Sequence, residues 1–232
     1  MSRQIKSLMG SIALVLWFIA SQYLIAFLIF LFVGVTSETF VVEHQFLITL
    51  LSYVLVLGVL IGLDKWKKKD ILEGYRDFQY ESFYKFIKYV VKYAMYGIGL
   101  WILSIFINAI FLPFFPEYGD QMDTLFVNKE HVIRFFVLVI GAPIVEEYIF
   151  RGKVQGTLKA AFGPRVAVIA QGVLFGIIHP FGLQKIYASV LGISFGWVRE
   201  KHGNVMTSTI MHMTINGIGW LMGMLSSYLL MQ

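Results

Sequence analysis

Near its N-terminus the chain runs from Ser7 to Ser37 without an Asp, Glu, Lys or Arg residue. A hydrocarbon core about 30 Å thick is crossed by roughly 20 apolar residues in a helix, so this stretch is long enough to span a membrane. It is too long for the core of a signal peptide, and no small-residue cleavage site closes it. We therefore expect an uncleaved first transmembrane helix.

Further apolar stretches follow along the whole chain, in which 58% of residues are hydrophobic and only 14% charged. The expected spans after the first are Gln45–Leu63, Lys92–Pro113, one beginning near His131 that carries Glu146 and Glu147, Arg165–His179, Gln184–Val198 and one within Asn204–Leu230. Continuous apolar runs exclude the alternating pattern of a membrane β-barrel. The sequence predicts an all-α, polytopic transmembrane helical bundle with about seven spans. We expect residues 1–130 to form an N-terminal part with three spans and a basic loop, and residues 131–232 to form a four-helix core.

Positive charge is distributed unevenly over the expected loops. Of 19 Lys and Arg residues, all but Lys129, Arg134 and Lys185 fall on one side of the membrane when the loops are assigned alternately. The positive-inside rule places that side, and with it the N-terminus, in the cytoplasm. The Lys65–Lys69 cluster is interpreted as an orienting loop that also suits contact with anionic lipid. We expect the segment Asp64–Tyr84 to lie as a helix at the membrane surface.

The composition bears on which kinds of site and partner the chain can have. The chain has no cysteine, which excludes a disulfide framework and a thiolate metal site. Its net charge of +5 comes from the basic loops, so we expect a lipid bilayer and no nucleic acid as partner.

Ionisable side chains at membrane depth are costly and indicate function. In GAPIVEEYIFRG, Glu147 and Arg151 are four residues apart and share a helical face, whereas Glu146 is rotated by about 100°. Adjacent carboxylates resist joint ionisation unless one is paired. We expect Arg151 to hold Glu147 ionised and Glu146 to face a cavity as a base, with a kink at Pro143. The alternative is that both acids lie at headgroup level.

A second polar position, His179, shares a helical face with Phe175, and Pro180 discourages continuation of that helix. Spans four and five are expected to meet at a turn near Gly163 and Pro164. At 1.5 Å per residue, Glu146 and His179 both lie roughly 23–26 Å from this turn, so they should face each other. The alternative for His179 alone is a satisfied helix-end residue.

The last apolar stretch contains His212 and Asn216, four residues apart on one face. Hydrogen bonding between helices is the alternative for this pair. Taken with Glu146 and His179, however, the set suits amide hydrolysis. A carboxylate or imidazole can take a proton from water, and an amide and a histidine can donate to an oxyanion.

The three segments read E-E-x-x-x-R at Glu146–Arg151, F-x-x-x-H at Phe175–His179 and H-x-x-x-N at His212–Asn216. In this order they resemble the motifs of the intramembrane CAAX-protease and bacteriocin-processing family, also called the Abi family. The resemblance covers about residues 131–225. It implies a helical bundle with a water-accessible cavity, in which Glu146 activates water with help from His179. His212 and Asn216 would form the oxyanion hole, with Glu147, Arg151 and Phe175 in support.

The family resemblance also bears on cofactor, substrate and location. A metal-free glutamate mechanism explains Asn216 better, and the alternative is zinc bound by Glu146, His179 and His212. Eukaryotic relatives remove the last three residues of prenylated proteins, and bacterial relatives mature peptides or leaders or confer bacteriocin immunity. We expect a membrane-associated peptide or protein as substrate and the plasma membrane of a bacterium as location.

Two other functions remain open for the polar cluster. A non-catalytic protein for bacteriocin self-immunity or partner regulation has no physical need for a base together with oxyanion donors. A proton-relaying transporter often shows an internal repeat, which is absent here. The spacings Gly192-x-x-x-Gly196 and Gly219-x-x-x-Gly223 favour close packing of helices within the chain, with dimerisation as the alternative. The oligomeric state is not predicted.

Overall fold

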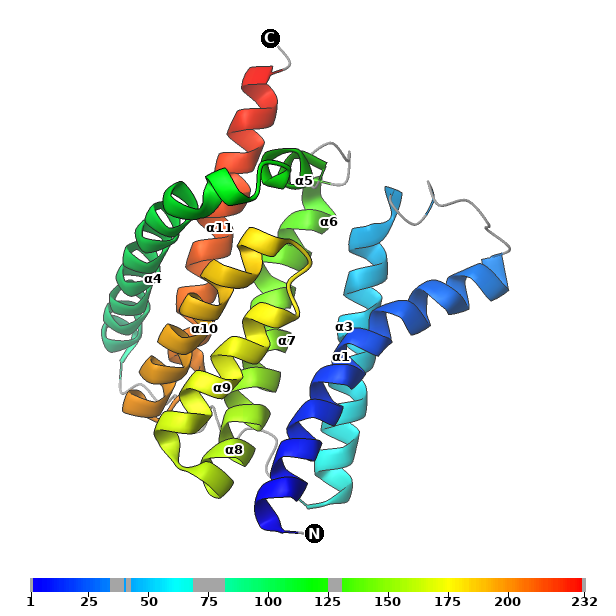
Figure 1. The fold of residues 1–232 in the computed structure, drawn as a ribbon, viewed down its shortest axis with the longest axis vertical. Coiled ribbons are helices and arrows are strands. Elements are labelled where there is room, and N and C mark those ends of the chain that lie inside the picture. Colours follow the sequence, from blue (N-terminus) through cyan, green and yellow to red (C-terminus); the bar gives the residue numbers. More distant parts are fainter. Residues whose placement is uncertain (1, 34–39, 41–42, 69–81, 125–130, 231–232) are drawn as a thin grey trace.

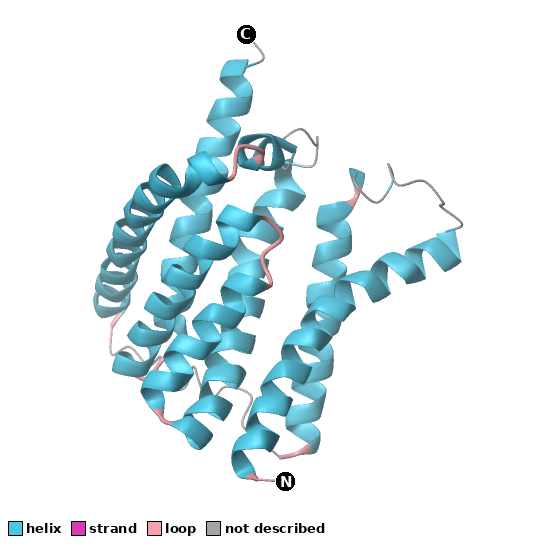
Figure 2. Ribbon diagram, in the orientation of Figure 1, coloured by secondary structure: helices cyan, strands magenta, loops and turns pink. Residues whose placement is uncertain are grey.

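The computed structural model describes residues 2–33, 40, 43–68, 82–124 and 131–230. Within these ranges the regular elements are helices and no strand occurs (Figures 1 and 2). The predicted all-α class is therefore confirmed. The surface helix predicted over Asp64–Tyr84 falls mostly on residues outside the described ranges.

Every expected span corresponds to helical structure. The main helices are α1 (Arg3–Val33), α3 (Gln45–Trp66), α4 (Phe83–Phe111), α5 (Tyr118–Thr124), α6 (His131–Phe135), α7 (Ala142–Glu147), α8 (Gln155–Phe162), α9 (Pro164–Ile177), α10 (Gly182–His202) and α11 (Val205–Leu230). A short 3₁₀ turn, η1 (Leu112–Phe114), precedes α5. Of these, α1, α3 and α4 are by themselves long and apolar enough to cross a membrane. A helical membrane bundle is confirmed, and the number of about seven spans stays a prediction.

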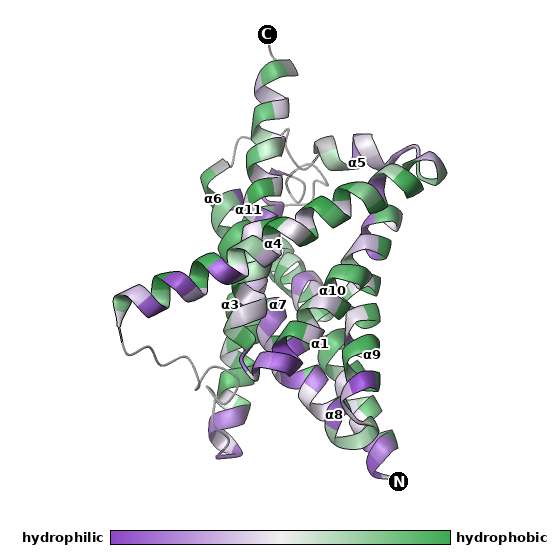
Figure 3. Cartoon of the chain, turned by 90° about the vertical axis from the view of Figure 1, so that its left-hand side faces the viewer, coloured by the Kyte–Doolittle hydropathy of each residue, from purple (hydrophilic) through white to green (hydrophobic). Residues whose placement is uncertain are grey.

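The two ends of the bundle differ in character. Figure 1 places the N-terminus, the end of α3, the α8–α9 turn and the end of α10 at one end, and the C-terminus at the other. Hydrophilic residues gather at the end that holds the N-terminus and α8 (Figure 3). This arrangement agrees with the predicted grouping of the basic loops on one side.

The fourth predicted span is one long helical segment with two wide-turned stretches. The π-helical stretches η2 (Phe136–Gly141) and η3 (Tyr148–Val154) flank α7 on either side. Pro143 lies in the first turn of α7, directly after η2, so the disturbance expected at this proline coincides with π-helical turns. The two adjacent glutamates are thus carried between two π-helical stretches, a backbone form frequent at functional sites.

Helices α8 and α9 form an antiparallel pair around a sharp turn. Gly163 adopts a φ of 82°, which side-chain-bearing residues rarely adopt, and Pro164 begins α9 with the backbone angle that a helix start requires. The turn predicted near these two residues is therefore confirmed.

Helices α9 and α10 pack with their backbones in close contact. A Cβ atom on Gly172 would lie 2.5 Å from the backbone nitrogen of Ile193, and one on Gly192 would lie 2.9 Å from the Gly172 carbonyl oxygen. Gly196 is equally restricted, because a Cβ there would lie 2.2 Å from Nε2 of Gln171. The intramolecular role predicted for Gly192 and Gly196 is confirmed. Gly219, in contrast, faces open space.

Candidate active site

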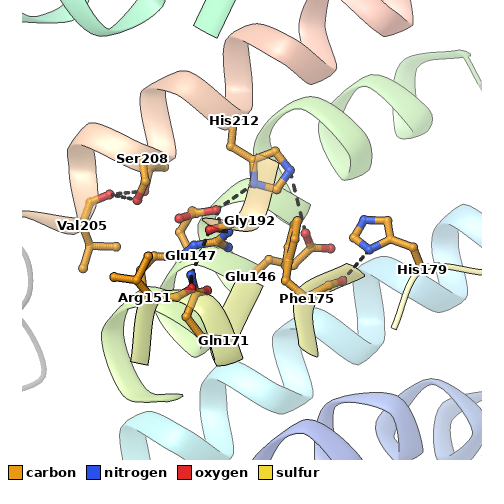
Figure 4. Close-up of polar contacts among 12 residues, drawn as sticks. Glu146, Glu147, Arg151, Gln171, Phe175, His179, Gly192, Val205, Ser208 and His212 are labelled. Atoms are coloured by element: carbon orange, nitrogen blue, oxygen red, sulfur yellow. Dashed lines mark hydrogen bonds and ion pairs between the residues drawn. The ribbon is translucent and has the colours of Figure 1, made fainter. Parts of the chain in front are cut away.

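The pair predicted at four-residue spacing forms inside the bundle. Nη1 of Arg151 lies 2.9 Å from Oε1 of Glu147, and both side chains are completely buried. A buried carboxylate is tolerated only when it is paired and hydrogen-bonded, so Arg151 supplies what Glu147 needs. The predicted pairing of these two residues is therefore present in the structure (Figure 4).

Arg151 is itself held on several sides. Its Nη2 atom donates to the Gly192 carbonyl oxygen at 3.1 Å. Its guanidinium carbon lies 4.4 Å from the ring centroid of Phe175 and 5.1 Å from that of Phe195. A guanidinium between two aromatic faces gains cation–π attraction while losing water. Phe175, a supporting residue in the prediction, thus packs directly on the pair.

His212 reaches both glutamates from α11. Its Nδ1 atom lies 3.0 Å from Oε1 of Glu147, the oxygen that also accepts from Arg151. Its Nε2 atom lies 3.8 Å from Oε2 of Glu146. The Nδ1 nitrogen therefore carries the proton that Glu147 accepts, and the Nε2 nitrogen is directed to the Glu146 carboxylate (Figure 4).

The adjacent glutamates have different surroundings. Glu147 is completely buried, whereas Glu146 keeps 9% of its surface exposed. Within the described residues, Glu147 is paired with Arg151, whereas the basic side chain in contact with Glu146 is His212. One carboxylate is thus paired and completely enclosed, and the other keeps a small part of its surface exposed.

His179 lies just after the end of α9, in the turn that leads to α10. Its Nδ1 atom contacts the Phe175 carbonyl oxygen at 2.7 Å, so Nδ1 donates and Nε2 is left free to act as an acceptor. The Phe150 and Phe175 rings meet at 5.2 Å, and these residues lie four positions after Glu146 and four before His179. The antiparallel register therefore places Glu146 and His179 at one level, as expected.

The histidine in contact with Glu146 differs from the one expected. The sequence predicts that Glu146 faces His179, but in the structure Nε2 of His212 lies 3.8 Å from Oε2 of Glu146. His179 and His212 both pack against the Phe175 ring, at 4.8 Å and 5.7 Å between centroids. Counting residues from a turn predicts the depth at which a residue lies on each of two helices. It does not predict how a third helix is rotated about its axis.

Asn216 lies one turn beyond His212 and contacts another part of the chain. Its Nδ2 atom donates to the Leu138 carbonyl oxygen of η2 at 2.8 Å. A π-helical stretch leaves carbonyl groups in altered positions, and the Asn216 amide bonds one of them. A second N–H of the same amide remains for another acceptor.

Two buried glutamines also belong to the surroundings of the site and were not predicted. Nε2 of Gln171 donates to the Gly192 carbonyl oxygen at 2.8 Å, and Nε2 of Gln155 donates to that of Gly196 at 3.0 Å. Both side chains are completely buried. For Gln155, the available signal was its four-residue spacing from Arg151 on one helix face. A search restricted to ionisable residues does not find such an uncharged side chain.

A polar cluster joins α3 to the site helix, the continuous helical segment from η2 to α8. Tyr148, the residue after Glu147, donates its hydroxyl to Oδ2 of Asp64 at 2.8 Å. Lys153 forms an ion pair with the same Asp64 oxygen. Asp64 lies in α3, a helix in which the sequence showed nothing diagnostic.

The predicted zinc ligands do not form a metal-binding group in this arrangement. Among the residues that the structure describes, no three His, Cys, Asp or Glu side chains are placed so as to hold a metal ion. His212 directs its two ring nitrogens at carboxylates, and His179 directs Nδ1 at a backbone carbonyl. The positions of these side chains do not match a tetrahedral zinc site.

Comparison with known proteins points to one family. Residues 128–218 match the family model described as type II CAAX prenyl endopeptidase Rce1-like. UPF0177 protein YxdF of Lactococcus lactis subsp. lactis (strain IL1403) is 29% identical over 85 residues, which are 36% of this chain and 46% of that protein. Membrane-embedded CAAX protease MroQ of Staphylococcus aureus (strain USA300) is 27% identical over 144 residues, 56% of this chain and 57% of that protein.

The chain thus spans about half the length of these curated relatives. No solved structure matches it. The matched segment contains all three motifs and each of the site residues described above. Residues 128–218 of this chain are thus similar to the Rce1-like CAAX endopeptidase family.

Proposed function

We propose that this chain is an intramembrane endopeptidase that hydrolyses a peptide bond of a membrane-associated peptide or protein with water activated by Glu146. The observation that carries the proposal is the buried series of contacts from Arg151 to Glu147, from Glu147 to His212 and from His212 to Glu146. This series keeps one carboxylate fixed and leaves the second accessible, which is the division of roles that a general base requires.

In the proposed reaction Glu146 takes a proton from a water molecule as the water oxygen attacks the scissile carbonyl carbon. The carbonyl π electrons move to oxygen and form an oxyanion. Glu146 then passes the proton to the amide nitrogen, the oxyanion re-forms the carbonyl as the C–N bond breaks, and a carboxylic acid and an amine leave. Because His212 Nε2 lies only 3.8 Å from Glu146, a single water can hydrogen-bond to both side chains.

His212 and Asn216 are the proposed oxyanion donors. His212 turns Nε2 towards Glu146 and the reacting carbonyl as the proposed donor, while Nδ1 stays bonded to Glu147. Asn216 donates through the N–H that does not bond Leu138. His179 enters from the opposite side at the level of Glu146 and offers its free Nε2 to the water or to the leaving amine.

The substrate class and location follow from the relatives and from charge. A relative named as a CAAX protease supports cleavage near the C-terminus of a membrane-bound protein, and maturation of a peptide or bacteriocin leader is the second substrate class of the proposal. The basic end of the bundle supports an N-terminus in the cytoplasm of a bacterial cell. We favour a mechanism without a metal.

The experiment uses the full chain in liposomes with two fluorogenic peptides, one ending in a prenylated CAAX sequence and one an unprenylated apolar leader. We expect Glu146→Gln to slow cleavage by roughly 10²–10⁴-fold, the range for loss of a general base, and His179→Ala to slow it as well. Glu117→Gln serves as a control, because this exposed glutamate takes part in none of the contacts of the site. Unchanged cleavage by Glu146→Gln contradicts the proposal, and a chelator that abolishes wild-type cleavage contradicts the metal-free form of it.

A further inference from the structure

Three side chains on the site helix contact α10 at one constant spacing. Arg151 donates to the Gly192 carbonyl oxygen at 3.1 Å, and Gln155 donates to the Gly196 carbonyl oxygen at 3.0 Å. Lys159 forms an ion pair with Glu200. Each contact is displaced from the one before it by four residues on both helices, and we call this series the α10 ladder.

The α10 ladder links two helices that run in the same direction. Both η3–α8 and α10 lead from the site to the basic end of the bundle, with α9 returning alongside them (Figure 1). Residues four apart on a helix lie on one face, separated by about 6 Å along the axis. Successive contacts at this interval fix how far one helix is displaced along the other.

The middle contact of the ladder has no explanation in the proposed chemistry. Gln155 is completely buried and lies two helical turns from Glu147, too far to touch the reacting groups. Its Oε1 atom is buried without a hydrogen-bond partner, so only its Nε2 donor is used by the chain. A completely buried side chain that uses only its donor indicates a requirement for the bonds donated to α10.

The facing surface of α10 is shaped to receive this donor. Gly196 leaves its carbonyl open because it has no side chain, and a Cβ atom there would lie 3.1 Å from Oε1 of Gln155 and 2.2 Å from Nε2 of Gln171. Nε2 of Gln155 also lies 3.4 Å from Oε2 of Glu200. Gln155 thereby connects the middle contact with the ion pair between Lys159 and Glu200.

The outer ion pair selects among possible registers. Glycine carbonyls at positions 192 and 196 are chemically equivalent, so a slide by one helical turn would let Gln155 bond Gly192 instead of Gly196. Such a slide would separate Lys159 from Glu200 and remove Arg151 from between Phe175 and Phe195. The charged and aromatic contacts at the two ends therefore decide which glycine carbonyl Gln155 meets, and the Gln155 bond then holds the two helices at that register.

We propose that Gln155 is a positioning residue that fixes the axial register of the glutamate-bearing helix against α10, and thereby the place of Glu146 relative to His179 and His212. Its role in cleavage rests on the proposed function, whereas its role in helix register does not. The structural claim and the catalytic claim are therefore tested separately.

The register is measured by pulsed electron paramagnetic resonance. Because the chain has no native cysteine, spin labels can be attached at Val132→Cys and Lys201→Cys, both exposed positions, without background. These positions lie near opposite ends of the two helices, roughly 40 Å apart along the axis. In Gln155→Met, an apolar residue of similar length, we expect the distance distribution to broaden or shift by less than about 5 Å, one helical turn, because the contacts of Arg151 and Lys159 still exclude a full-turn slide.

Cleavage by Gln155→Met is measured on the same liposomes. We expect kcat to fall roughly 10- to 100-fold with little change in KM, because the reacting groups move relative to one another while the substrate still binds. Gln171→Met is the matched control, since Gln171 is equally buried and bonds the Gly192 carbonyl from α9 without joining the ladder. It should leave the label distance unchanged.

Three outcomes overturn the inference. The first is a wild-type distance distribution in Gln155→Met, and the second is a wild-type kcat despite a shifted distance. The third is an equal shift in Gln171→Met, which would assign the effect to loss of any buried glutamine. If Glu146→Gln cleaves at the wild-type rate, the proposed function fails, and the label distance still decides whether Gln155 sets the register.

Discussion

The N-terminal helices and the C-terminal core use membrane-depth residues in opposite ways. In the most apolar windows of α1, α3 and α4, only 17%, 33% and 11% of residues are buried, so most of their apolar side chains face outward. The C-terminal core instead buries Glu147, Arg151, Gln155 and Gln171 completely. Helices that face lipid are specified by hydropathy alone, whereas helices that enclose a reaction are specified by polar contacts within an apolar bundle.

The contrast explains why hydropathy identifies the membrane-spanning helices of the N-terminal part more readily than those of the C-terminal core. The criteria of length and apolar composition select α1, α3 and α4 and pass over the helices that carry the site. Polar side chains lower the hydropathy of those helices, yet Arg151, Gln155 and Gln171 each donate at least one hydrogen bond inside the bundle. Three substitutions, ordered by expected effect, test how far the two regions differ.

The largest loss of stability is expected when the core loses a charge partner. Arg151→Met leaves the fully buried Glu147 carboxylate without its main partner, and breaking a buried ion pair costs about 3–5 kcal/mol. Thermal unfolding in detergent measures the change. The double variant Glu147→Gln with Arg151→Met should recover much of the stability, since no charge is then left unpaired. A double variant as unstable as Arg151→Met would contradict the electrostatic explanation.

An intermediate effect is expected where the two regions meet. Gly97 of α4 packs on α11 beside His212, and a Cβ there would lie 2.8 Å from the Met211 carbonyl oxygen and 2.8 Å from Cβ of Thr214. Gly97→Ala should cost about 1–3 kcal/mol through overpacking and should slow cleavage by displacing α11. Gly99→Ala is the matched control, because nothing lies within 4 Å of its Cβ position. Equal behaviour of the two variants would show that α4 is only an anchor.

The smallest effect is expected at the cluster that connects α3 to the site helix. Asp64→Asn weakens the ion pair with Lys153, whose side chain is 25% exposed, but an amide can still accept from the Tyr148 hydroxyl. Partly exposed ion pairs contribute about 1 kcal/mol or less, so we expect a small fall in unfolding temperature with cleavage retained. Loss of cleavage at unchanged stability would show that α3 contributes to the site itself. It would contradict the assignment of the site to the C-terminal core alone.

Local spacing predicted the parts of the site that lie on a single helix. The four-residue spacing of Glu147 and Arg151 places them on one face whatever the rest of the chain does, and the structure shows the bond. The common level of Glu146 and His179 followed from equal distances to the Gly163 turn. These predictions needed only helical geometry.

Contacts that depend on the rotation of helices were not predictable in the same way. The sequence places His212 on a face with Asn216, but it does not say that this face turns His212 towards both glutamates and Asn216 towards the Leu138 carbonyl. The π-helical stretches around α7 also change the rotation by amounts that no residue pattern revealed. The glutamine contacts were missed because their partners are backbone carbonyls, which have no signature in the sequence.

Whether Glu146 and His212 act as one unit is tested most directly by a double-mutant cycle on cleavage. The values of kcat/KM are measured for Glu146→Gln, His212→Ala and the double variant in liposomes, with folding checked by thermal unfolding. Groups that act together lose their effect together, so the double variant should be no slower than the slower single variant. Losses that multiply would show two independent contributions and would contradict a shared site.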